Sequence, residues 1–179
     1  MATEITAKKI LSEREISNLK ETLGFASKRD QLIIDLLMSF GMRGAELRDI
    51  KREDLNIEEG SLFVRGKKRS RDREFPIESN LLARLEAFVI ENRIGPHKPI
   101  FEVSESGLKF IWNRLRPCKK GIHSLRHTFA VKLYERTRDV KVVQLFLGHR
   151  SISSTQVYID FVYSRSKMQK VLQGDLYVS

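Results

Sequence analysis

Histidine and arginine side chains occur at helical spacing in the second half of the chain. His123 and Arg126 are three residues apart, so both side chains leave one face of a predicted helix, while Leu125, Phe129 and Leu133 cover another face. A histidine and an arginine on one exposed face can hold an anion. This pair alone is not specific, because a His-x-x-Arg match is common by chance.

A second histidine and a tyrosine follow further along the chain. His149 comes directly after Gly148 at the predicted end of a helix, and Tyr158 lies nine residues beyond His149. A tyrosine on an amphipathic helix is more often half-buried packing than a nucleophile. Spacing alone therefore does not distinguish Tyr158 from the other tyrosines, which are Tyr134, Tyr163 and Tyr177.

Basic side chains gather in two short stretches. Six of the nine residues from Arg65 to Arg73 are Lys or Arg, a density that like-charge repulsion disfavours unless an anion or solvent offsets it. A solvated loop is the simpler interpretation, and we favour a loop that contacts phosphates. The second stretch contains Arg114, Arg116, Lys119 and Lys120. From both stretches we take as phosphate-contacting residues Arg65, Lys68, Arg69, Arg71, Arg73, Lys119 and Lys120.

The chain as a whole is also basic. Its 179 residues include 33 Lys and Arg against 23 Asp and Glu, a formal charge of +10. This charge favours a nucleic acid partner ahead of an anionic membrane, although a scattered excess would serve solubility alone. The one cysteine, Cys118, cannot form an internal disulfide, and Asp35 interrupts the most apolar stretch. We therefore expect a soluble cytoplasmic protein with no signal peptide or membrane span.

Helices must position most of these residues. Ser12 and Glu15 have the spacing of a capping box, which predicts a helix that ends near Gly24. Apolar periodicity predicts further helices over residues 32–40, 81–89, 107–115, 123–136, 139–147, 151–158 and 164–173. Residues 62–64 and 74–77 are predicted strands of a β-hairpin with a cationic turn at 69–72. The expected fold is mainly α with a small antiparallel β-sheet near residues 50–77, an α+β domain.

Four motifs occur together in a fixed order. They are Gly-Met-Arg-Gly-Ala-Glu-Leu (41–47), Gly-Lys-Lys followed by Arg-Glu-Phe-Pro-Ile (66–77), His-Ser-Leu-Arg-His-Thr-Phe-Ala (123–130) and Leu-Gly-His-Arg-Ser-Ile-Ser-Ser-Thr-Gln-Val-Tyr (147–158). In order and spacing they resemble the tyrosine recombinase and phage integrase family over nearly the whole chain. The resemblance implies Tyr158 as the nucleophile, Glu46 as the acidic residue that braces the site, and a catalytic set of Arg43, Lys67, His123, Arg126, His149 and Tyr158. The hairpin is a residue longer than usual, which leaves Lys68 as an alternative to Lys67.

Phosphodiester cleavage accounts for these residue types. The guanidinium groups of Arg43 and Arg126 can grip the non-bridging oxygens and stabilise the extra charge of a pentacovalent transition state. A tyrosine hydroxyl has a pKa of about 10, so neighbouring cations would favour the attacking phenolate. Lys67 is the candidate general acid for the departing sugar oxygen, and the two histidines would hydrogen-bond the phosphate or adjust the tyrosine's proton. Because a phosphotyrosyl bond stores the energy of the broken bond, we expect no ATP, metal or other cofactor.

The resemblance also implies a domain organisation and partners. We expect residues 1–179 to form a single catalytic domain, with the family's N-terminal DNA-clamping domain absent. It would act on double-stranded DNA as a site-specific recombinase with a 3′-phosphotyrosyl intermediate, as a monomer in solution and a tetramer on paired sites. Residues 164–179, with the apolar end Leu176–Val178, are candidates for exchange with a neighbouring protomer or for folding back onto their own domain.

Four alternatives remain at this point. A type IB topoisomerase uses similar chemistry without exchanging partners, and a helix-turn-helix regulator would explain the basic charge but not the catalytic set. A metal-dependent nuclease would need clustered carboxylates, which are missing at the basic sites. His123, His127 and His149 could bind zinc, but no glutamate lies between the first two, and Arg126 would place positive charge beside the ion.

Overall fold

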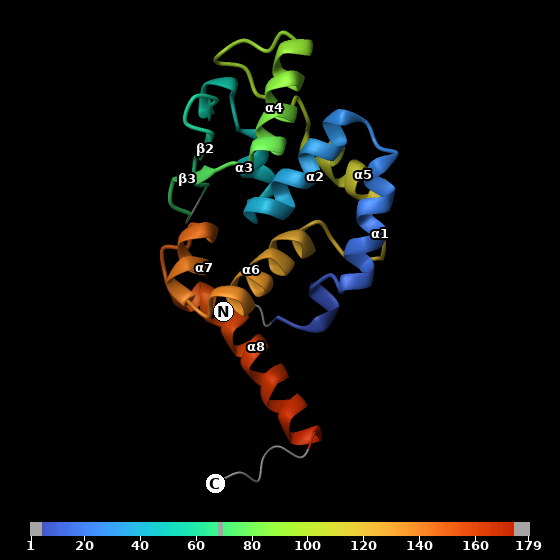
Figure 1. Cartoon of the computed structure of the whole chain (residues 1–179), viewed down its shortest axis with the longest axis vertical. Coiled ribbons are helices and arrows are strands. Elements are labelled where there is room, and N and C mark those ends of the chain that lie inside the picture. The colour runs from blue at the N-terminus through green and yellow to red at the C-terminus, as the bar shows by residue number, and fades with distance from the viewer. Residues whose placement is uncertain (1–4, 68–69, 174–179) are drawn as a thin grey trace.

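The computed structural model of the chain describes residues 5–67 and 70–173 (Figure 1). The elements follow one another as η1 (Ala7–Lys9, a 3-10 helix), α1 (Glu13–Gly24), α2 (Lys28–Phe40), α3 (Gly44–Arg48), η2 (Arg52–Asp54), β1 (Leu55–Asn56), β2 (Ser61–Val64), β3 (Arg73–Pro76), α4 (Ser79–Glu91), α5 (Glu105–Leu115), α6 (His123–Thr137), α7 (Val140–Leu147) and α8 (Ser153–Leu172). Helices dominate, which confirms the predicted fold class. None of the helices in the described residues is long and apolar enough to cross a membrane.

The sheet is small and antiparallel, as the sequence predicts. Its strand order is β1-β2-β3, with Leu62 opposite both Leu55 in β1 and Phe75 in β3. β1 has only two residues, too few for alternating polarity to reveal it in the sequence. The predicted hairpin is therefore correct, and a short third strand completes the sheet.

Local capping signals set the helix ends where the sequence places them. Ser12 and Glu15 form the predicted capping box of α1, in which the Glu15 carboxylate accepts from the Ser12 N–H at 2.7 Å. Asp139 accepts from the first N–H groups of α7. Gly41 and Gly148 end α2 and α7 in the left-handed conformation, with φ of 58° and 66°. Both glycines stand at the edge of the site described below.

The last helix differs from the prediction. Two helices were expected, over 151–158 and 164–173, but α8 is continuous from Ser153 to Leu172. The intervening residues Ile-Asp-Phe-Val-Tyr (159–163) contain no glycine or proline to end a helix. Val162 lies one turn after Tyr158, and both side chains are buried in the same apolar cluster. The predicted apolar end, Leu176–Val178, lies outside the described residues.

The apolar core is divided into two clusters. The larger one joins α1, α2, the sheet, α4 and α5, and the smaller one joins α6, α7 and α8 with Ile5. Figure 1 shows the sheet and α4 at one end of the molecule and α8 projecting from the other. Phe146 of α7 packs against both clusters, and its ring centroid lies 5.5 Å from Phe75 and 5.8 Å from Phe129. The functional residues gather where the two clusters meet.

Candidate active site

A pocket of about 300 Å³ lies at the junction of the two clusters. Five of the six predicted catalytic residues line it, although they come from segments up to 115 positions apart, from Arg43 to Tyr158. The full lining is Ile5, Arg43, His123, Arg126, His127, His149, Ser154, Val157 and Tyr158. Lys67, the sixth predicted residue, lines an adjacent groove of about 520 Å³ together with Arg43 and His123.

Arg126 ties three chain segments together beside this pocket. Its guanidinium is buried and donates to the carbonyl of Gly41 at 2.6 Å, the carbonyl of Leu147 at 2.9 Å and Nε2 of His149 at 3.1 Å. The two carbonyls lie at the C-terminal ends of α2 and α7, where helix dipoles favour a cation. Burial first, and then the charge of Arg43, lower the pKa of Arg126 to about 10, so it remains charged at neutral pH.

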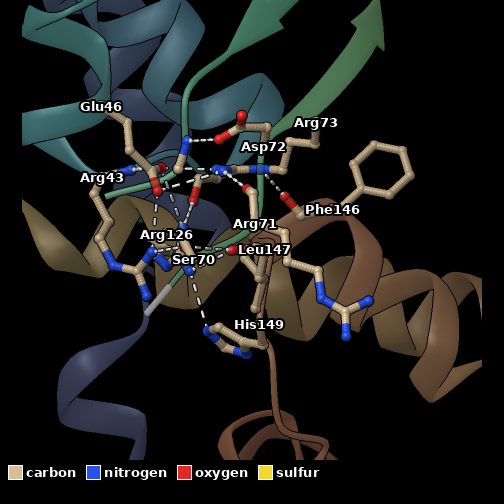
Figure 2. Close-up of polar contacts among 12 residues, drawn as sticks. Arg43, Glu46, Ser70, Arg71, Asp72, Arg73, Arg126, Phe146, Leu147 and His149 are labelled. Carbon is tan, nitrogen blue, oxygen red and sulfur yellow. Dashed lines mark hydrogen bonds and ion pairs between the residues drawn. The ribbon is translucent and has the colours of Figure 1, made fainter. Parts of the chain in front are cut away.

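Glu46 lies at the centre of a cluster of arginines (Figure 2). Its carboxylate is fully buried and accepts from Arg43 Nη1 at 3.0 Å and from Arg73 Nη2 at 2.7 Å, while Arg126 Nη1 lies 3.9 Å away. Burial opposes ionisation of Glu46, but the hydrogen bonds and charge of Arg73, the Arg43 N–H and the Arg126 charge together lower its pKa to about 2. One negative group thus faces three guanidinium groups, and the cluster keeps an excess of positive charge.

His149 is held in one protonation state by its two partners. Nε2 lies 3.1 Å from Arg126 Nη2, and Nδ1 lies 3.0 Å from the Thr155 hydroxyl. An arginine cannot accept a hydrogen bond, so Nε2 accepts and Nδ1 carries the proton. Burial, followed by the charges of Arg126, Arg43 and Arg73, lowers the pKa of His149 to about 3. His149 is therefore a neutral imidazole at physiological pH.

Tyr158 occupies the sixth position of α8 and is only 4% exposed. Its hydroxyl lies 3.1 Å from Nδ1 of His127, and the two ring centroids are 5.9 Å apart. Burial raises the pKa of Tyr158, and the nearby charges of Arg126 and Arg43 oppose that increase. The resting side chain is a phenol placed against a cationic pocket.

The hairpin between β2 and β3 docks on the turn between α7 and α8. Ser70 forms an isolated antiparallel bridge with His149, and the Arg71 N–H donates to the Gly148 carbonyl at 2.8 Å. The Ser70 hydroxyl also accepts a hydrogen bond from Arg43 Nη1, as Figure 2 shows. The hairpin loop thus forms part of the site.

Comparisons with known proteins agree with this geometry. The model of the Phage integrase family matches residues 9–165. This chain belongs to the phage integrase family. Tyrosine recombinase XerA of Pyrococcus furiosus is 37% identical over 165 residues, which cover 86% of this chain and 57% of the relative. The chain therefore spans little more than half the length of that family member.

Solved structures of family members share the fold. The XerH site-specific recombinase, in a pre-cleavage complex with its difH substrate, has a TM-score of 0.67 and 26% identity, covering 89% of this chain and 52% of that one. The catalytic domain of bacteriophage HP1 integrase has a TM-score of 0.65 and 21% identity, covering 90% of this chain and 95% of that one. The likeness to the HP1 domain extends over almost its full length.

Lys67 is the residue that the family resemblance implies as the hairpin lysine. In this chain it forms an ion pair. Its ammonium group contacts the carboxylate of Asp49, and both side chains are partly exposed. The competing candidate, Lys68, lies outside the described residues. Lys67 lies in the groove next to the pocket, and its ammonium group is paired with Asp49.

Two residues of the predicted phosphate-contacting set are placed differently from the expectation. The Arg73 side chain is 7% exposed and pairs with Glu46, and its Nε donates to the Phe146 carbonyl at 2.8 Å. The Lys120 ammonium donates to the Ile10 carbonyl and to both Glu15 oxygens at 2.7–2.9 Å. The buried carboxylate of Glu46 holds Arg73, and the partly buried carboxylate of Glu15 holds Lys120, so in this structure both cations join elements of the fold.

The remaining members of that set lie at the surface or outside the described residues. Arg65 pairs with Asp54 and Glu53 but keeps a partly exposed side chain. Arg71 and Lys119 are exposed, and Arg69, like Lys68, is outside the described residues. Arg65, Arg71 and Lys119 thus remain available to contact a phosphate backbone.

The zinc alternative is not supported by the placement of the histidines. His149 uses both ring nitrogens for Arg126 and Thr155, and His127 Nδ1 faces Tyr158. Among residues 5–67 and 70–173, no group of three or more His, Cys, Asp or Glu side chains is placed to hold a metal ion. A zinc site would require these hydrogen bonds to break.

The sequence analysis considered His127 only as a zinc ligand and did not identify Ser70 or Thr155. His127 contacts the Tyr158 hydroxyl, Ser70 contacts Arg43, and Thr155 orients His149. The position of His127, directly after Arg126 and four residues after His123, was a usable signal, because residues four apart share a helix face. Ser70 and Thr155 carried no such signal, since their partners lie on other elements or across a turn.

Proposed function

We propose that the chain is the catalytic domain of a site-specific tyrosine recombinase that cleaves and rejoins double-stranded DNA. The convergence of Arg43, His123, Arg126, His149 and Tyr158 in one pocket is the observation that carries this proposal. The names of the Pyrococcus relative, a tyrosine recombinase, and of XerH, a recombinase bound to its DNA substrate, support it. A site-specific recombinase is the function that best explains the whole set.

The charge of the pocket suits a phosphodiester. Arg43, Arg73 and Arg126 outnumber the single carboxylate of Glu46, so a DNA phosphate supplies the missing anion. Arg43 has a side chain 33% exposed and can turn its free guanidinium edge to the phosphate. Arg126 lies beside it, where its fixed charge stabilises the extra negative charge of the transition state. The exposed His123 can donate a hydrogen bond to the phosphate, and neutral His149 holds the Arg126 guanidinium in place.

Tyr158 supplies the nucleophile in this mechanism. Its oxygen attacks phosphorus, a 3′-phosphotyrosyl bond forms, and the 5′-oxygen leaves as a hydroxyl after gaining a proton. Lys67 is the candidate donor of that proton, provided that it exchanges Asp49 for the DNA. Attack by a 5′-hydroxyl on the phosphotyrosyl bond then rejoins the strand, and no ATP, metal or other cofactor enters the scheme.

The same proposal includes partners and location. Exposed Arg71 and Lys119 and the partly exposed Arg65 are candidate contacts to the DNA backbone. We propose a single catalytic domain that is monomeric in solution and assembles as a tetramer on paired sites. A DNA partner, together with a single cysteine in 179 residues, favours the cytoplasm.

Covalent capture tests the nucleophile. The protein is incubated in EDTA with a library of nicked random duplexes, and adducts that survive denaturation are isolated, sequenced and mapped by mass spectrometry. We expect the wild type to carry DNA on Tyr158 through a 3′-phosphate, with a free 5′-hydroxyl. Tyr158→Phe should abolish the adduct and leave binding of duplex DNA within about twofold, because only the attacking oxygen is removed.

Tyr163→Phe is the matched control, because Tyr163 lies on the same helix with a side chain 65% exposed. It should form the adduct normally. An adduct on Tyr134, Tyr163 or Tyr177, or an adduct formed by Tyr158→Phe, would overturn the assignment. Relaxation of supercoiled plasmid without recombinant products would contradict a recombinase and favour a topoisomerase.

A further inference from the structure

The proposed nucleophile is already hydrogen-bonded to a histidine outside the predicted catalytic set. Nδ1 of His127 lies 3.1 Å from the Tyr158 hydroxyl, within the range required of a general base and its proton. His127 is half-buried and also lines the pocket, so its ring reaches both the phenol and the space that a phosphate would occupy. The ring planes are inclined by 43°. The contact therefore runs between two rings that meet at an angle, not stacked face to face.

We propose that Nδ1 of His127 is the base that accepts the hydroxyl proton of Tyr158 as its oxygen attacks the DNA phosphate, an inference that rests on the function proposed above. His127 is then a catalytic residue, because it touches the reacting hydroxyl directly. The ring must present an unprotonated Nδ1, so its proton resides on Nε2.

The proton and bond changes balance with the groups already named. The bond from the Tyr158 oxygen to phosphorus forms, and the phosphorus bond to the 5′-oxygen breaks. The phenol proton passes to His127, and the 5′-oxygen takes a proton from a cationic acid, for which Lys67 is the candidate. During religation His127 returns its proton to the tyrosine oxygen, so each cycle restores both residues.

Other groups in the pocket cannot replace His127 in this role. Arg126 has no acceptor atom, and His149 already uses Nε2 for Arg126 and Nδ1 for Thr155. His123 lies on the same helix face but is exposed, whereas Nδ1 of His127 lies 3.1 Å from the Tyr158 hydroxyl. The geometry thus selects one of the three histidines.

Burial and the surrounding positive charges keep Nδ1 of His127 unprotonated. His127 faces His123 and Arg126 on its own helix, Lys9 on η1 and Tyr158 on α8. Burial first, and then the charges of His123, Arg126 and Lys9, lower the pKa of His127 to about 4, so the ring is neutral at pH 7. A bound phosphate anion opposes these cations and raises that pKa, and bond formation to phosphorus makes the phenol proton more acidic. Both changes favour transfer in the transition state.

The test compares the pH dependence of cleavage in the full chain. His127→Asn places an amide where Nδ1 stands, which retains a hydrogen bond but cannot take a proton at neutral pH. Single-turnover cleavage of the duplex recovered by covalent capture is followed from pH 5 to 10. The wild type should show a rate that is nearly constant around pH 7. The variant should be slower by on the order of 10²-fold and gain about tenfold per pH unit, because tyrosine must ionise before it attacks.

Two controls separate this role from a structural one. His97→Asn changes a histidine that is 83% exposed and paired with Glu53, and it should follow the wild-type profile. Replacing Tyr158 with a fluorinated tyrosine lowers the pKa of the attacking phenol. This replacement should restore the rate of His127→Asn far more than it changes the rate of the wild type. If His127→Asn does not fold, the fluorinated tyrosine is combined with His127→Gln instead.

The outcomes distinguish failure of this inference from failure of the proposed function. A His127→Asn rate that runs parallel to the wild type at every pH, with the adduct still on Tyr158, overturns the role of His127 and leaves the recombinase proposal intact. Failure of the fluorinated tyrosine to restore the rate of His127→Asn would also overturn the role of His127. An adduct that forms on another residue, or in Tyr158→Phe, overturns the proposed function itself.

Discussion

One carboxylate, Glu46, holds the three arginines of the site in place. It is fully buried and is the anionic partner of Arg43 and Arg73, with Arg126 at 3.9 Å. A pKa held at about 2 instead of 4.5 corresponds to about 3 kcal/mol of stability. Because the folded pKa is depressed, this stability is present above pH 4.5 and is lost as the pH falls toward 2.

Glu46→Gln should therefore destabilise the fold by about 3 kcal/mol at pH 7, since it leaves buried guanidinium groups without an anion. Urea unfolding at pH 7 and at pH 3 measures the effect, and the difference from the wild type should shrink at the lower pH. Glu91→Gln is the control, because Glu91 pairs with Lys28 at the surface and is half exposed. Equal losses in the two variants at pH 7 would contradict a central role for Glu46.

The hairpin and the α7–α8 turn act as one unit at the scale of elements. Gly148 has φ of 66°, and a Cβ built there would lie 2.9 Å from the Arg71 carbonyl. Gly60 has nearly the same backbone, φ of 61°, but its nearest neighbour is a Leu82 methyl carbon at 3.7 Å. The two glycines differ mainly in whether the hairpin lies against them.

Substituting alanine at both glycines separates strain from docking. Gly60→Ala should cost about 1 kcal/mol through backbone strain alone, and Gly148→Ala about 1–2 kcal/mol more, because the hairpin must move. Hydrogen exchange at the Arg71 amide, which donates to the Gly148 carbonyl, should accelerate in Gly148→Ala and stay slow in Gly60→Ala. Unchanged exchange in both variants would show that the hairpin does not depend on close approach at Gly148.

At the scale of the whole molecule, α8 extends well past the pocket. Tyr158 and Val162 anchor its first half in the core, whereas Tyr163, Met168 and Leu172 are 65%, 65% and 87% exposed. Figure 1 shows this second half projecting away from the other helices. Apolar side chains are costly to leave in water, and we expect these to contact another protomer on paired DNA sites.

Removal of residues 165–179 should reduce recombination between two sites by on the order of 10²-fold while leaving binding to one site within about twofold. The physical reason is that the pocket and its core anchors remain, whereas the expected contact between protomers would be removed. Gel shift on single sites and product formation on paired sites measure the two effects. Leu172→Asp should resemble the truncation, and Phe25→Asp, which changes an apolar residue 95% exposed elsewhere, should not. Normal recombination by the truncated chain would rule out this role for α8.

Local signals were sufficient for most elements, whereas the expected membership of the pocket came from the family resemblance of four ordered motifs. Capping at Ser12, helical periodicity and the glycines at 41 and 148 act within a few residues, so they can be recognised without knowledge of the fold. The five residues that the resemblance implies as catalytic, Arg43, His123, Arg126, His149 and Tyr158, do line one pocket.

Only the tertiary structure decided which polar side chains meet across different elements. Arg73 belongs to a basic stretch that the sequence predicts to contact phosphates, but packing turns it toward Glu46, 27 positions away. Lys120 pairs with Glu15 across 105 positions, and His127 meets Tyr158 across 31. Such contacts depend on how helices and strands pack, and the spacing of residues within one element carries no information about the element opposite. The contact between His127 and the proposed nucleophile, Tyr158, therefore became visible only with α6 and α8 packed together.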